Sequence, residues 1–153
     1  MKKYYIAYGS NLNVPQMSYR CPDAKVIGTG EMEGWQLLFK GSKTGAYLTI
    51  EPAKDGRVPI AIWEVSAADE EALDYYEGYP NFYYKTEMHV PVREIKTEKT
   101  RKRDAFVYIM REDALAGTPS RLYVRTCLEG YQSFGFDEEF LKDAIKRSEA
   151  MME

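Results

Sequence analysis

The most constraining feature of this sequence is an apolar, aromatic-rich run near its start that stops abruptly at Gly9. Residues 4–8 are Tyr and Ile with one Ala, and this composition favours the pleated, half-buried backbone of a strand. Gly9, Ser10 and Asn11 then form a tight polar loop, in which glycine permits a positive φ or a close approach of the backbone. Such a loop can turn its N–H groups toward an anion or carbonyl, although a first strand followed by an Asx-type turn has the same pattern.

The length and the charge of the chain argue against several classes of protein. The chain has 153 residues, of which 44% are hydrophobic, so we expect residues 1–153 to form a single domain. A net charge of −3 gives no general attraction to nucleic acid or to an anionic membrane. The longest apolar runs, such as residues 60–63, are too short to span a bilayer, and we expect a cytoplasmic protein. The oligomeric state cannot be read from the sequence.

The residues that commonly bind metals are few and scattered. Cys21 and Cys127 are isolated, without CxxC spacing, so we expect reduced thiols rather than a disulfide. His89 is the single histidine, which excludes a histidine-rich metal site and argues against a Ser-His-Asp triad. We therefore expect no metal.

Strand patterns dominate the first two thirds of the chain, and helical patterns dominate its end. We expect strands within residues 4–8, 25–39 (a kinked pair), 46–51, 58–65, 82–93 and 104–110. We expect helices after Asn13, over residues 66–77, from Thr118 with Pro119 in first position, and from about residue 137. This order predicts an α+β fold, with a largely antiparallel sheet and helices against one side.

The strand at 82–93 alternates between two faces, and the segment that follows it is basic. Tyr84 shares its parity with Met88, Val90 and Val92, so we expect it to face inward and Tyr83 to face outward. Residues 96–103 are polar and basic and indicate an exposed hairpin connection. They have no interleaved aromatic residues for base stacking, so we expect no nucleic-acid partner.

Glu77 is a candidate for chemistry because it ends an apolar helix inside the aromatic cluster of residues 75–80. Burial there would raise the pKa of its carboxyl above the ordinary value of about 4.3, toward the range of a general acid/base. A surface glutamate before a glycine helix stop has the same pattern, so Glu77 alone does not decide the function.

Two motifs in order resemble the gamma-glutamylcyclotransferase family, also described as AIG2-like. The first is Tyr8, Gly9, Ser10, Asn11 and Leu12, and the second is Leu-Asp-Tyr-Tyr-Glu-Gly-Tyr-Pro at residues 73–80. The strand at 105–108 and Pro119-Ser120 at a helix start support the resemblance, which covers nearly the whole chain.

The resemblance implies a small, mostly antiparallel β-barrel with flanking helices and a cavity at its side. Family members cyclise a gamma-glutamyl amide to 5-oxoproline, and by motif Glu77 looks like the catalytic general acid/base. The residues that look like substrate contacts are Tyr8, Gly9, Ser10, Asn11 and Leu12 in the loop, with Tyr84 and Tyr108 as side-chain contacts. The family's tyrosine matches either Tyr83 or Tyr84, and strand parity selects Tyr84.

The chemistry suits these residue types, because a gamma-glutamyl group carries its own nucleophile, an α-amine that reaches the γ-carbonyl. The enzyme must fold the substrate, move protons and stabilise an oxyanion, so no metal or organic cofactor is expected. The expected partner is a small gamma-glutamyl molecule. The alternative is a non-catalytic AIG2-like barrel that binds a small molecule or a protein, and the carboxylate of Glu77 argues against it.

Overall fold

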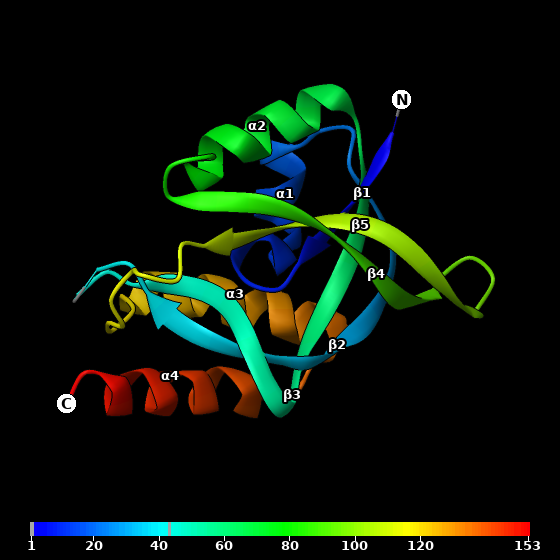
Figure 1. Ribbon diagram of the computed structural model, residues 1–153. Coiled ribbons are helices and arrows are strands. Elements are labelled where there is room, and N and C mark those ends of the chain that lie inside the picture. Colours follow the sequence, from blue (N-terminus) through cyan, green and yellow to red (C-terminus); the bar gives the residue numbers. More distant parts are fainter. Residues whose placement is uncertain (1, 43) are drawn as a thin grey trace.

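The computed structural model describes residues 2–42 and 44–153, and its strands close into a barrel in the order β1-β3-β2-β4-β5 (Figure 1). The strands are β1 (Lys3–Ala7), β2 (Lys25–Lys40), β3 (Tyr47–Val65), β4 (Tyr83–Glu94) and β5 (Thr100–Met110). The helices are η1 (Ser10–Leu12, a 3-10 turn), α1 (Val14–Arg20), α2 (Ala67–Glu77), α3 (Arg121–Phe134) and α4 (Glu139–Met151). All strand pairs are antiparallel except β1 with β5. The predicted α+β fold with a mostly antiparallel barrel is confirmed.

The two longest strands, β2 and β3, differ from the sequence-based prediction, which divided each of them into two. The pairs Glu33↔Arg57 and Trp35↔Pro52 are consecutive along the ladder, so the residues of β3 between them bulge out while pairing continues on both sides. Asp55, at the predicted turn, has φ 65° inside this bulge. Bulges bend a strand without ending it, so one long ribbon can coil around the barrel.

The helices cover two sides of the barrel rather than the one side predicted. In Figure 1, α2 lies at the top and α4 at the bottom, with the barrel between them. α3 begins at Arg121, two residues later than predicted, because the side chain of Ser120 accepts the N–H of Tyr123 at 3.1 Å and caps the helix there. No helix in the described part of the chain is long and apolar enough to cross a membrane.

The predicted helix α2 is confirmed together with its capping box. The Ser66 hydroxyl accepts the Asp69 N–H at 3.1 Å, and a carboxylate oxygen of Asp69 accepts the Ser66 N–H at 3.1 Å. Gly78 ends the helix with φ 64°, a left-handed conformation that glycine adopts without a steric penalty. Glu77 is therefore the last residue of a well-defined helix.

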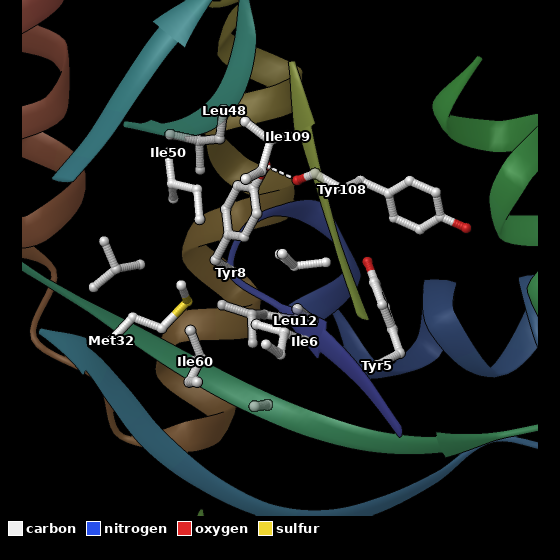
Figure 2. Packing of buried hydrophobic residues seen from close by; sticks show 14 of the residues in the cluster. Tyr5, Ile6, Tyr8, Leu12, Met32, Leu48, Ile50, Ile60, Tyr108 and Ile109 are labelled. Atoms are coloured by element: carbon white, nitrogen blue, oxygen red, sulfur yellow. Dashed lines mark hydrogen bonds between the residues drawn. The ribbon is translucent and has the colours of Figure 1, made fainter. Parts of the chain in front are cut away.

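The core fills the barrel interior, where Tyr8 points among apolar side chains such as Leu48, Ile50 and Ile109 (Figure 2). Tyr108 comes from the neighbouring strand but points the opposite way, out of the barrel and toward α2 (Figure 2). Both faces of β5 are thus covered, one by the barrel interior and the other by α2.

The loop after β1 packs against α3. Gly130 of α3 lies so close to η1 that an added Cβ would be 2.5 Å from the carbonyl carbon of Leu12. Leu12 itself is fully buried. This close approach fixes the position of the Ser10–Leu12 turn relative to the barrel.

We therefore expect Gly130→Ala to lower stability by about 1–2 kcal/mol, although alanine is ordinarily better than glycine inside a helix by about 1 kcal/mol. The methyl group would overlap the backbone of Leu12, which cannot move without displacing η1. Chemical denaturation measures the change. Gly45→Ala is the matched control, since its Cβ would lie 3.7 Å from the nearest atom, and should change stability by less than about 0.5 kcal/mol. A Gly130→Ala protein as stable as the wild type would contradict this packing.

Candidate active site

A cavity of about 410 Å³ lies between the end of α2, the η1 turn and the barrel. Its volume is within the range of about 300–1,000 Å³ that is common for small-molecule sites. Six residues predicted from the sequence line it together: Tyr8, Gly9, Ser10, Asn11, Glu77 and Tyr108. The structure thus brings the two motifs to one place, although 65 residues or more separate Glu77 from the loop.

Two of the predicted contacts do not line the cavity. Leu12 is fully buried in the core behind η1, against Gly130. Tyr84 lies outside, at the surface, where its hydroxyl donates to the carboxylate of Glu112. Tyr83 lines the cavity instead, and its hydroxyl donates to the carbonyl of Leu48 at 2.7 Å.

The prediction that Tyr84 faces the cavity is wrong for a definite reason. Its parity does match that of Val90 and Val92, which are buried in the barrel. However, β4 has a second covered face, because Lys85 is opposite Tyr108 in the ladder and binds side chains of α2. The cavity lies on that second face, so the alternation rule selected the wrong side of the strand.

The side chains of the loop are engaged in hydrogen bonds around the cavity. The amide of Asn11 donates to the Tyr5 hydroxyl at 2.9 Å, and its carbonyl oxygen accepts from the guanidinium of Arg20. The hydroxyls of Ser10 and Tyr76 lie 3.0 Å apart and share a hydrogen bond. Arg20 also stacks over the Tyr76 ring, 3.4 Å from its centroid, and so links the loop to α2.

The backbone of the loop has free donors. Gly9 precedes η1 with φ −133°, so the positive φ considered for it is not needed. The N–H groups of Ser10 and Asn11 have no acceptor among the residues that the structure describes, as is usual for the first positions of a helical turn. These groups are available to an anionic or carbonyl ligand.

Glu77 is half-buried at the cavity, and the pKa of its carboxyl is raised. Burial raises the pKa of its carboxyl to about 7, and the positive charge of Arg20 acts in the opposite direction. No donor in the described residues hydrogen-bonds to the carboxylate. Such a group can accept and return a proton near neutral pH.

A second network fixes α2 to the barrel beside Glu77. The Tyr108 hydroxyl donates to Asp74 at 2.6 Å, and the ammonium of Lys85 lies 2.9 Å from the same carboxylate oxygen. Lys85 also pairs with Glu70, one turn earlier on α2, at 2.7 Å. Both α2 and the ring of Tyr108 are therefore held by groups that lie outside the cavity.

No sequence pattern indicated Arg20 or Lys85 as parts of this site, and strand parity selected Tyr84 over its neighbour Tyr83. Arg20 ends an ordinary amphipathic helix, and its partners on the loop and α2 are tertiary neighbours. Lys85 was assigned to an outward face, which α2 covers. Across residues 2–42 and 44–153, no group of three or more His, Cys, Asp or Glu side chains is arranged to hold a metal.

Comparison with known proteins gives one family. The family model described as "Gamma-glutamyl cyclotransferase, AIG2-like" matches residues 5–126. No curated protein sequence matches the chain. A solved structure titled "Gamma-glutamyl cyclotransferase" is 21% identical, with a TM-score of 0.78 over 94% of this chain and 86% of that one.

Two further solved structures come from mammals. An uncharacterized human protein is 23% identical, with a TM-score of 0.76 over 94% of this chain and 86% of that one. An AIG2-like protein from Mus musculus is 22% identical, with a TM-score of 0.58 over 80% of this chain and 82% of that one. At these identities the structural likeness shows a shared fold.

We expect Arg20→Met to raise the pKa of Glu77 above its value of about 7, because the guanidinium favours the charged carboxylate and methionine does not. An NMR titration of the side-chain carboxyl carbon of Glu77 measures the shift. Arg57→Met is the control, since Arg57 pairs with Glu31 away from the cavity and should leave the titration unchanged. An unchanged or lower pKa in Arg20→Met would show that Arg20 does not act on Glu77.

Proposed function

Since this chain belongs to the AIG2-like gamma-glutamyl cyclotransferase family, we propose that it cyclises a gamma-glutamyl amide to 5-oxoproline with release of an amine or amino acid. The observation that carries the proposal is a half-buried carboxyl, Glu77, with a pKa of about 7, in the same small cavity as the polar loop after β1. This combination supplies a proton-transfer group and backbone donors in one place.

The proposed reaction is balanced without a second reactant. The α-amine nitrogen of the substrate forms a bond to the γ-carbonyl carbon, and the bond from that carbon to the amide nitrogen breaks. One proton leaves the attacking nitrogen and one is added to the departing nitrogen. The chain's task is to hold the substrate in a folded conformation and to transfer these protons.

Glu77 is proposed as the general base and then the general acid. A carboxyl with an ordinary pKa of about 4.3 would be a weak base toward an ammonium and would rarely be protonated at neutral pH. With a pKa of about 7, both forms are populated, so one group can take the proton from the α-amine and deliver it to the leaving nitrogen.

The loop is proposed to bind the glutamyl part of the substrate through its backbone. The N–H groups of Ser10 and Asn11 are free, whereas the side chains of both residues are engaged with neighbours. Backbone donors can hold the substrate α-carboxylate or stabilise the tetrahedral oxyanion without adding a group that titrates.

The tyrosines are proposed to contact the substrate through their rings. The hydroxyls of Tyr8, Tyr83 and Tyr108 each donate to a protein acceptor, at 2.7, 2.7 and 2.6 Å. Their hydrogen-bond donors are thus already in use, and the rings shape a rigid wall. Tyr83 takes the role that the sequence assigned to Tyr84.

We place the reaction in the cytoplasm and propose that it uses no cofactor. The mechanism needs no oxidant, reductant or Lewis acid, because the substrate supplies its own nucleophile. Cys21 and Cys127 are both free and buried, which is consistent with a reducing compartment.

The central test is Glu77→Gln in an assay of 5-oxoproline release from a panel of gamma-glutamyl amides. We expect at least about a 10²-fold loss of rate, because glutamine has the same shape but cannot accept the proton. In the wild type, kcat/KM should fall as the pH drops below about 7, where Glu77 becomes protonated. Glu71→Gln, an exposed position on the same helix, is the control.

Wild-type turnover by the Gln variant would remove Glu77 from the mechanism. Tight binding of a gamma-glutamyl amide with no 5-oxoproline at any pH would instead identify the chain as a binding barrel.

A matched pair of variants tests whether Tyr83, rather than Tyr84, contacts the substrate. We expect Tyr83→Leu to raise KM about tenfold, because the ring wall of the cavity is lost, and Tyr84→Leu to stay within about twofold of the wild type. Thermal melting checks that both variants fold. A larger effect from Tyr84→Leu than from Tyr83→Leu would restore the original assignment.

A further inference from the structure

Apart from the half-buried Tyr123, the aromatic residues that line the cavity fall into two groups by exposure. The inner group consists of buried tyrosines: Tyr5, Tyr8, Tyr83 and Tyr108. The outer group consists of residues that are 38% to 91% exposed: Tyr47, Tyr75, Tyr76 and Phe82. Exposed aromatic surface that gathers at the mouth of a cavity, rather than scattering over the protein, indicates a binding surface.

Two rings of the outer group, those of Tyr47 and Phe82, are supported by neighbouring residues. Tyr47 of β3 and Phe82 of the turn before β4 meet edge-to-face, with ring centroids 6.2 Å apart and an interplanar angle of 89°. Tyr47 also meets Tyr123 edge-to-face at 5.1 Å. Phe82 lies against Gly41, where an added Cβ would be 2.9 Å from the tip of its ring. These rings are therefore held in place before any ligand arrives.

The charges around the cavity are unfavourable to a second carboxylate on the ligand. Among the lining residues in the described part of the chain, only Glu77 is ionisable as an acid or base of ordinary range, and it is an acid. The cations of the neighbouring elements are already engaged, Arg20 with the loop and Lys85 with acidic residues of α2. The glutamyl carboxylate has the backbone donors of the loop, whereas no lining residue in the described part of the chain offers a cation to a further carboxylate.

The proposed reaction determines how the substrate lies relative to the aromatic and polar parts of the cavity. In the proposed reaction the glutamyl group lies at Glu77 and the loop, and the amide substituent extends away from them. The outer aromatic group is the exposed part of the lining, so a substituent that extends toward solvent would meet residues such as Tyr47, Tyr75 and Phe82.

We infer that the amine released by this protein carries an aromatic ring and no carboxylate, so that the substrate class is the gamma-glutamyl arylalkylamides. This inference rests on the proposed function. The outer rings bind the aromatic ring of the leaving amine by edge-to-face contact, and the lack of a cation among the lining residues that the structure describes disfavours amino acids and peptides as leaving groups.

Three synthetic ligands separate the two parts of the inference. Gamma-glutamyl-2-phenylethylamine is the test ligand, gamma-glutamyl-phenylalanine adds a carboxylate to it, and gamma-glutamyl-ethylamine removes its ring. Release of 5-oxoproline by the wild type gives kcat/KM for each, and calorimetry with Glu77→Gln gives Kd without turnover.

We expect the phenylethylamide to exceed each of the other two by at least about tenfold in kcat/KM and in affinity. Equal values for the phenylethylamide and the phenylalanine compound would overturn the exclusion of carboxylates. Equal values for the phenylethylamide and the ethylamide would overturn the aromatic preference. If no ligand yields 5-oxoproline, the proposed function fails, and the Kd values still support or overturn the ligand class.

Rim variants test whether the outer group is responsible. Tyr47→Leu and Phe82→Leu keep apolar volume but remove the ring, and each should reduce the preference for the phenylethylamide over the ethylamide by about 3- to 10-fold. Tyr19→Leu is the matched control, because Tyr19 is 91% exposed and does not line the cavity. An unchanged preference in both rim variants, when they melt like the wild type, would overturn the role of the outer rings.

Discussion

The site depends on the ion pairs that hold α2 against the outer face of β4 and β5. Lys85 lies 2.7 Å from Glu70 and 2.9 Å from Asp74, and the Tyr108 hydroxyl donates to the same carboxylate oxygen of Asp74. Together with the buried side chain of Leu73, these contacts fix the distance of α2 from the barrel and so the position of Glu77 at its end. Pairing two carboxylates with one ammonium also satisfies charges that are largely shielded from water.

The same arrangement accounts for the acidity of Glu77. Its neighbours on α2, Glu70 and Asp74, have cationic or hydroxyl partners, whereas Glu77 faces tyrosine rings with Arg20 as the nearby positive charge. Burial without a direct partner raises its pKa to about 7, and this costs folding stability progressively as the pH rises from the ordinary pKa of about 4.3, with the full cost reached above about 7. A buried carboxyl with a shifted pKa is common where a protein needs a proton-transfer group.

The tyrosine-rich wall adds rigidity to this site. The hydroxyls of Tyr8, Tyr83 and Tyr108 are bound to acceptors contributed by the protein, so the position of each side chain is fixed at both ends. From the other side, α3 supports the η1 turn through the close approach of Gly130. The backbone donors of the loop and the carboxyl of α2 are therefore held by separate supports, which is the preorganisation that catalysis by positioning requires.

Local patterns in the sequence determined the elements with local causes. The capping box of Ser66 and the glycine stop at Gly78 define α2 and place Glu77 at its end, because their hydrogen bonds join residues a few positions apart. The order of elements and the paired motifs predicted the α+β barrel. The continuity of β3 through Asp55, the choice of Tyr83 over Tyr84 and the role of Arg20 were decided only by the tertiary structure. Each depends on a distant segment, namely a paired strand, a covering helix or a neighbouring loop, and local alternation carries no information about which face such a segment will cover.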